Sequence, residues 1–98
     1  MKSGSGFTPA EAVQVFKALA DPTRYQMVRL LLNCTDGEMG CGEFDHAFDL
    51  SKPAMSHHYR VLENAGLVTS RKAGQRVYYR LAHDGLERIL PGFAVNHQ

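Results

Sequence analysis

The sequence has no long hydrophobic run. A helix that spans a membrane needs about 18 or more consecutive apolar residues, and the longest apolar stretch here, residues 27–32, is interrupted by Arg29. The first six residues, MKSGSG, lack the apolar segment of a secretory signal peptide. We therefore expect a cytoplasmic protein without membrane contact, with residues 1–6 as a flexible leader and residues 7–98 as a single domain.

Cysteine is also scarce. The two cysteines, Cys34 and Cys41, are too few for the disulfide framework of a small secreted domain. In a reducing cytoplasm such a thiol pair is inert, metal-binding or redox-active. The composition therefore excludes a disulfide scaffold and leaves these three roles open for the pair.

Charge is nearly balanced over the whole chain, at +1, but it is unevenly distributed. Residues 51–80 contain six Lys or Arg and a single acidic residue, Glu63, while the rest of the chain has a net charge of −4. Basic charge concentrated in one segment is typical of a surface that binds a polyanion such as nucleic acid. A solvated basic surface without a partner is the alternative, and charge alone does not decide between them.

Start signals and apolar spacing predict several helices. The capping box at residues 8–11 begins a helix over about 9–19, and Asp21-Pro22 begins a second, strongly apolar helix. Residues 35–40, TDGEMG, read as a polar loop before a short helix over 41–48. Ser51 caps a further helix that ends at Gly66.

After Gly66 the apolar period changes from that of a helix to that of a strand. The runs LVTSRK and RVYYRL are β-type, joined at Ala73-Gly74-Gln75, and a last helical segment from Leu86 is ended or kinked at Pro91-Gly92. The fold class is thus mainly α with a small β-hairpin. The order α-α-α-α-β-β-α predicts a winged helix-turn-helix.

The segment SKPAMSHHYRVLENAGL has the character of a helix that reads DNA. Such a helix needs a first turn without bulk and then hydrogen-bonding side chains, so that it fits the major groove. The backbone amide groups at the start of this helix, with the capping serine, can bind a phosphate. The basic hairpin can contact a neighbouring phosphate or the minor groove. The predicted DNA-binding residues are Ser51, Lys52, Ala54, Met55, Ser56, His57, Arg60, Arg71, Lys72, Gln75 and Arg76.

The adjacent histidines, His57 and His58, have other readings. Neighbouring residues on a helix point about 100° apart, so the pair does not converge on one metal ion. A catalytic pair would need a nucleophile or carboxylate arranged nearby. We expect His57 to face DNA and His58 to be partly buried against the hairpin. We also expect no enzyme activity, no cofactor and no metal site.

Three segments, LADPTRYQMVRLLL, DLSKPAMSHHYRVLENAGLV and RKAGQRVYYRL, resemble the ArsR-type (ArsR/SmtB) winged-helix repressors, over roughly residues 10–85. The resemblance implies a homodimer, packed through its first and last helices, that binds a palindromic double-stranded operator. It also implies that an inducer relieves repression.

This sequence lacks the ligand residues of the two commoner inducer sites of that family, the arsenic-type and the zinc-type site. The arsenic-type positions fall at Gly40 and Gly42, on either side of Cys41. The zinc-type positions fall at His83, Gly85 and Asn96, with Asp84 and His97 one step out of register. Sliding the last helix by one residue recovers two zinc ligands, which keeps zinc as a minor alternative.

The thiol pair then becomes the candidate sensor, with peroxide or another oxidant as inducer. The glycine-rich loop between Cys34 and Cys41 allows a disulfide, and the start of a helix lowers the pKa of a cysteine there. The carboxylates of Asp36 and Glu38 have the opposite effect, because nearby negative charge raises the pKa of a thiol. The alternatives are cysteines without a role and a soft-metal site from Cys34, Cys41 and His46.

Two hypotheses that assign the protein a different kind of function remain. One is a winged helix that binds protein rather than DNA, which would need an apolar reading surface. The other is a small thiol enzyme with His46 as base, for which 98 residues leave little room to form a pocket.

Overall fold

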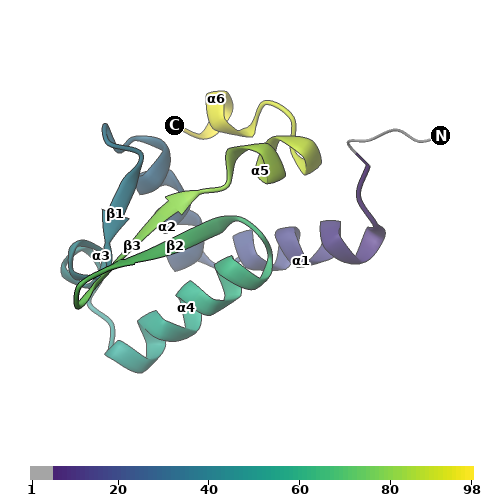
Figure 1. Ribbon diagram of the computed structural model, residues 1–98. Coiled ribbons are helices and arrows are strands. Elements are labelled where there is room, and N and C mark those ends of the chain that lie inside the picture. Colours follow the sequence, from purple (N-terminus) through teal and green to yellow (C-terminus); the bar gives the residue numbers. More distant parts are fainter. Residues whose placement is uncertain (1–5) are drawn as a thin grey trace.

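The computed structural model describes residues 6–98 (Figure 1). The leader predicted for residues 1–6 lies outside the described residues, apart from Gly6. The mainly helical winged helix-turn-helix fold is confirmed. Its elements are α1 (Pro9–Leu19), α2 (Pro22–Leu32), β1 (Glu38–Gly40), α3 (Cys41–Ala47), α4 (Lys52–Asn64), β2 (Val68–Ala73), β3 (Arg76–Leu81), α5 (His83–Ile89) and α6 (Phe93–His97).

Helix boundaries follow the local capping signals. In the capping box, the Thr8 hydroxyl accepts from the Glu11 amide at 3.1 Å, and the Glu11 carboxylate accepts from the Thr8 amide at 2.7 Å. The Ser51 hydroxyl accepts from the Ala54 amide at 3.2 Å and so fixes the first residue of α4. Gly66 ends α4 at a φ of +76°, a conformation that costs glycine little.

The sheet has a third strand that the sequence reading missed. Residues 38–40, predicted as part of a loop, form β1 and pair antiparallel with β3, with Glu38 opposite Arg80. The strand order is β1-β3-β2, so β1 lies beside β3, on the edge of β3 that does not pair with β2. The predicted loop is therefore wrong at these positions, because a three-residue edge strand has no periodicity of its own and depends on a partner far along the chain.

The C-terminal segment consists of two short helices. The break predicted at Pro91-Gly92 is confirmed: α5 ends at Ile89, Gly92 has a φ of +83°, and α6 begins at Phe93. The carboxylate of Glu87 accepts from the amides of Gly92 and Ala94 at 2.8 and 3.1 Å, which holds the break in place. In Figure 1 both helices lie on the side of the sheet opposite α4.

The core lies between the sheet and the helices, and three aromatic rings occupy the part of it next to α4. Tyr59 of α4 stacks on Tyr79 of β3, with ring centroids 4.5 Å apart, and Phe44 of α3 lies 5.9 Å from Tyr59. All three side chains are buried. Stacked and tilted aromatic contacts add to the free energy of burial, so α3, α4 and the sheet are fixed to one another at this point.

Tyr59 also makes the polar connection between α3 and α4. Its hydroxyl donates to the Asp45 carboxylate at 2.9 Å and lies 3.3 Å from the Cys41 carbonyl oxygen. Burial, together with the hydrogen bond to Asp45, raises the pKa of Tyr59 well above its ordinary value. The phenol therefore remains a donor at any working pH and keeps α4 at one angle to α3.

Replacing Tyr59 by phenylalanine tests this connection. The ring and its stacking remain, but the hydrogen bond to a carboxylate is removed, so we expect Tyr59→Phe to lower the free energy of unfolding by about 1–2 kcal/mol. Tyr78→Phe is the matched control, because no residue among 6–98 hydrogen-bonds the Tyr78 hydroxyl. Urea denaturation measures both variants, and equal stability of the two would contradict the role given to Tyr59.

Candidate nucleic-acid interface

The helix-turn-helix consists of α3, a connection of four residues and α4. Phe48 to Ser51 connect the helices, and Ser51 caps the second of them. In Figure 1 the start of α4 lies at the same end of the molecule as the tip of the β2–β3 hairpin. This is the arrangement in which a reading helix enters the major groove while a wing reaches the adjacent backbone.

Most of the residues predicted to read DNA on α4 are exposed. The exposed ones are Ser51, Lys52, Ser56, His57 and Arg60, while Ala54 is half-buried. Met55 is a correction: its side chain is 1% exposed. Met55, Tyr59 and Leu62 follow the i, i+4, i+7 spacing of one helical face, and that face packs into the core. Met55 therefore anchors α4 in the core and is not part of its exposed face.

The basic side chains of α4, Lys52 and Arg60, are exposed and are not held in strong ion pairs within residues 6–98. Lys52 is 91% exposed, and its ammonium lies 3.9 Å from the Asp45 carboxylate. An exposed pair at that distance contributes little. Arg60 has no ion pair among residues 6–98. Both side chains are thus available to a phosphate or a base edge.

The tip of the hairpin carries two more cations without acidic partners within the described chain, Lys72 and Arg76. They flank the turn at Gly74, which has a φ of +64°, and Gln75 beside them is also exposed. We call these residues, 72–76, the wing tip. Its charge and exposure suit contact with a neighbouring phosphate or the minor groove.

Arg71, the residue before the wing tip, has a different environment. Its Nε and Nη2 atoms donate to the two carboxylate oxygens of Glu38, at 3.1 and 2.5 Å, and its guanidinium lies 4.6 Å from the centre of the Tyr78 ring. The sequence reading grouped Arg71 with the other wing cations and gave Glu38 no role on the wing. The undetected strand β1 brings Glu38 there.

The two histidines of α4 face different surroundings. His57 is exposed, whereas the His58 side chain is only 13% exposed. The expected partial burial of His58 is confirmed, but its partners are in α2 and its cap rather than in the hairpin. Its Nδ1 lies 3.0 Å from Nη1 of Arg24 and 3.9 Å from the Asp21 carboxylate.

Arg24 connects that histidine to the end of α1. Its guanidinium also donates to the carbonyl oxygens of Ala18 and Lys17, at 2.8 and 3.3 Å. Because arginine only donates, His58 must accept at Nδ1 and therefore be neutral. Burial lowers the pKa of His58, and the positive charge of Arg24 lowers it further against the opposing effect of Asp21.

The two thiols lie at opposite ends of β1. Cys34 donates its thiol hydrogen to the Glu38 carbonyl at 3.0 Å, at the start of the strand, while Cys41 follows the strand as the first residue of α3. Three steps of extended chain span roughly 10 Å, and both thiols are free. A disulfide within one chain would therefore require the backbone between the two cysteines to rearrange.

The acidity expected for Cys41 is also a correction. Burial raises the pKa of its thiol, and the nearby Asp45 carboxylate raises it further, against the lowering effect of hydrogen bonds with Tyr79 and Tyr59. The thiolate is less populated at neutral pH than the position at a helix start predicts.

The structure also locates the remaining candidate metal ligands. Among residues 6–98, no group of three or more His, Cys, Asp or Glu side chains is arranged to hold a metal ion. His97 is one of the residues out of register with the zinc-type pattern. Its Nδ1 atom is hydrogen-bonded to the Tyr25 hydroxyl at 2.8 Å, and its ring stacks on Phe93. In the same part of the chain, no helix is long and apolar enough to cross a membrane.

Comparison with protein families agrees with this architecture. The profile of the family described as "Bacterial regulatory protein, arsR family" matches residues 21–70, which is half of the chain and includes α3 and α4. The chain belongs to the arsR family. The resemblance drawn from the three sequence motifs is thereby confirmed, and the part of this ArsR-family protein that the profile covers includes the helix-turn-helix.

Individual relatives of this ArsR-family protein are regulators rather than enzymes, as predicted. The transcriptional repressor SdpR of Bacillus subtilis is 40% identical over 67 residues, which are 68% of this chain and 71% of that protein. The arsenic resistance transcriptional regulator ArsR1 of Pseudomonas putida is 48% identical over 67 residues, 68% of this chain but only about half, 51%, of that protein.

A solved relative shares the whole domain. The homodimeric winged helix-turn-helix DNA-binding domain of Mb0332 from Mycobacterium bovis is 28% identical and superposes with a TM-score of 0.71. The superposition covers 93% of this chain and 88% of that one. The agreement extends beyond the residues matched by the family profile, to α1 and the C-terminal helices.

Acidification tests the neutral state of His58. Its pKa is lowered from 6.5 in the folded protein, so the unfolded chain binds the proton more tightly. Stability is therefore full above pH 6.5 and is lost as the pH falls through that value towards the folded pKa. In His58→Gln, an amide oxygen accepts from Arg24 without titrating, and we expect its Tm to fall less between about pH 7.5 and 5.5.

His57→Gln is the matched control, because it removes the exposed neighbour and leaves the Arg24 contact intact. Differential scanning calorimetry over that pH range compares the variants. The same fall in Tm for wild type and His58→Gln would show that acid destabilises the protein elsewhere.

Proposed function

We propose that this protein is a transcriptional repressor that binds a palindromic operator as a homodimer. The observation that supports the proposal most strongly is the shared position of the exposed polar turns of α4 and the wing tip, whose Lys72 and Arg76 have no acidic partner within residues 6–98. An apolar surface, which a protein-binding winged helix would present, is not found on the exposed face of α4. The face instead carries Ser56, His57 and Arg60.

Exposed apolar side chains support the dimer. Val13 and Phe16 on α1 are 47% and 51% exposed, and Val95 on α6 is 77% exposed. A domain of this size gains from a core shared between two copies, and the similar domain of Mb0332 is homodimeric. In such a dimer the two α4 helices read half-sites about one helical turn of DNA apart, which is why a palindrome is expected.

Substitutions on the two elements have different expected effects. If Arg60 or His57 contacts a base, its replacement by alanine weakens operator binding by about 1–3 kcal/mol and relaxes the sequence preference. Lys72→Ala or Arg76→Ala weakens binding to every sequence alike and reduces the salt slope by about 0.9 for each phosphate that is no longer neutralised. His46→Ala, an exposed histidine on α3, is the control for His57→Ala and leaves binding unchanged.

Fluorescence anisotropy with the protein's own upstream DNA and a scrambled duplex, over a range of salt, measures these effects. Affinity that does not depend on salt, or equal affinity for the two duplexes in every variant, contradicts the proposal. A reporter gene behind the upstream DNA tests the direction of control, and expression that rises with the protein contradicts repression.

As the switch, we propose oxidation of Cys34 and Cys41 to a disulfide. The two thiols lose two protons and two electrons as the S–S bond forms, and one hydrogen peroxide molecule takes these up as its O–O bond breaks, giving two molecules of water. The position of β1 between the cysteines supports this, because β1 pairs with β3 and continues directly into α3, which carries Cys41. We expect a bond between the cysteines that flank this strand to disturb its pairing and the position of α3. The raised pKa of Cys41 predicts a reaction that is slow at neutral pH and faster as the pH rises.

The expected result is that peroxide-treated wild type loses operator affinity, whereas Cys34→Ser and Cys41→Ser keep it. Anisotropy before and after treatment measures this, and dithiothreitol should restore binding of the wild type. If oxidised and reduced wild type bind equally, the cysteines have a structural role and the redox switch is wrong.

A further inference from the structure

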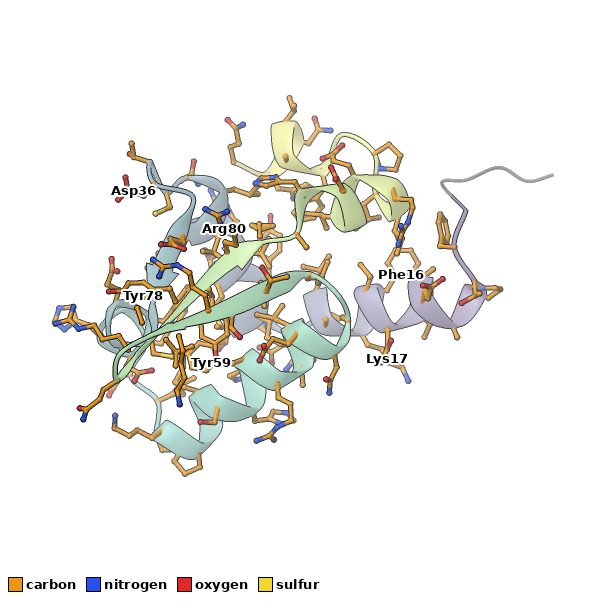
Figure 2. The ribbon with its side chains drawn as sticks, viewed as in Figure 1. Phe16, Lys17, Asp36, Tyr59, Tyr78 and Arg80 are labelled. Atoms are coloured by element: carbon orange, nitrogen blue, oxygen red, sulfur yellow. The ribbon has the colours of Figure 1, made fainter. Side chains whose placement is uncertain are left out.

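The outer face of the sheet carries a charge cluster that the sequence reading did not anticipate. Glu38 of β1 lies opposite Arg80 of β3, and Arg71 of β2 lies opposite Tyr78 of β3. Residues two apart on a strand share a face, so these four side chains lie together. The buried Tyr79 points to the other face. Figure 2 shows Tyr78 and Arg80 on the side of the sheet away from Tyr59 and α4.

Glu38 is the only acidic member of this cluster. Both of its carboxylate oxygens accept from Arg71, and one of them lies 4.0 Å from Nε of Arg80. The Glu38 side chain is 18% exposed, while those of Arg71 and Arg80 are 55% and 60% exposed. The hydrogen bond from Arg71 lowers the pKa of Glu38, so the carboxylate is ionised at neutral pH.

The hairpin therefore divides its four cations into two pairs. Lys72 and Arg76 at the wing tip have no acidic partner within the described residues, whereas Arg71 and Arg80 share Glu38. An arginine held in a two-point pair with a carboxylate must give up that pair before it can bind a phosphate. The shared carboxylate thus limits how much of the wing's charge is available to DNA.

We propose that Glu38 is a specificity-determining residue, which holds Arg71 and Arg80 on the outer face of the sheet and keeps them from adding sequence-independent affinity for DNA. The inference rests on the proposed DNA-binding function. Cations that contact phosphates strengthen binding to every sequence, and a regulator needs a high ratio of operator affinity to affinity for other DNA. A carboxylate that neutralises two cations beside the wing tip preserves that ratio.

Glu38→Gln tests the proposal, because glutamine keeps the shape of the side chain and removes its charge. We expect the affinity for a scrambled duplex to rise about three- to tenfold and its salt slope to steepen by about one to two phosphate contacts. Operator affinity rises less, so the ratio of the two falls. The matched control is Asp36→Asn, which makes the same charge change at an exposed position with no ion pair among residues 6–98.

The other outcomes overturn the proposal. A shallower slope and weaker binding to both duplexes would mean that Glu38 positions Arg71 on a phosphate. Equal effects of Glu38→Gln and Asp36→Asn would mean that only overall charge matters. If the single variant does not fold, the double variant Glu38→Gln/Arg71→Gln is used, and we expect its binding to scrambled DNA to be at least that of wild type. Weaker binding would overturn the proposal.

Failure of the proposed function gives a different result. In that case wild type itself does not prefer its upstream DNA over the scrambled duplex, whatever the effect of Glu38→Gln.

Discussion

The contact of Tyr59 with Asp45 and Tyr79 is the interaction on which the proposed DNA-binding surface depends. It fixes one helix against two partners at once, through a hydrogen bond of 2.9 Å to α3 and a ring stacked at 4.5 Å on β3. The opposite face of α4 is then free to present polar side chains in a defined direction. Arg24 and His58 hold the same helix from a second side, against the junction of α1 and α2. Helix α4 is therefore held by contacts with three different elements, α3, β3 and α2.

Strand β1 connects features that are otherwise separate. Its first residue, Glu38, accepts the thiol hydrogen of Cys34 on its carbonyl oxygen and holds Arg71 with its side chain. Its last residue, Gly40, leads directly into Cys41 and α3. A change at either thiol therefore reaches the wing and the helix-turn-helix through one short strand. The same strand lies between the two cysteines in the sequence, and its pairing with β3 is what the proposed oxidation would disturb.

The sequence predicted the features that depend on local chemistry. The caps Thr8, Asp21 and Ser51 and the end at Gly66 determined the helices, because each signal acts within a few residues. Glu38 and β1 were missed, because Arg71, which pairs with the Glu38 side chain, is 33 residues away. The partner of β1 is β3, also far along the chain, and a three-residue strand has no period. Met55 was misassigned, because it lies in the first turns of the helix, directly before the polar residues Ser56 and His57, and so was grouped with them rather than with the buried face that it shares with Tyr59. The thiol acidity of Cys41 depends on burial, which spacing does not reveal.

Amide NMR of the full chain, titrated with a duplex of its upstream DNA, tests the central claim that the exposed face of α4 and the wing tip form the DNA-binding surface. The largest chemical-shift changes are predicted at Ser56, His57 and Arg60 and at residues 72–76. Small changes are predicted at Glu38 and Arg80 on the outer face of the sheet. Changes concentrated on the outer face or on α5, with α4 unaffected, would contradict the claim.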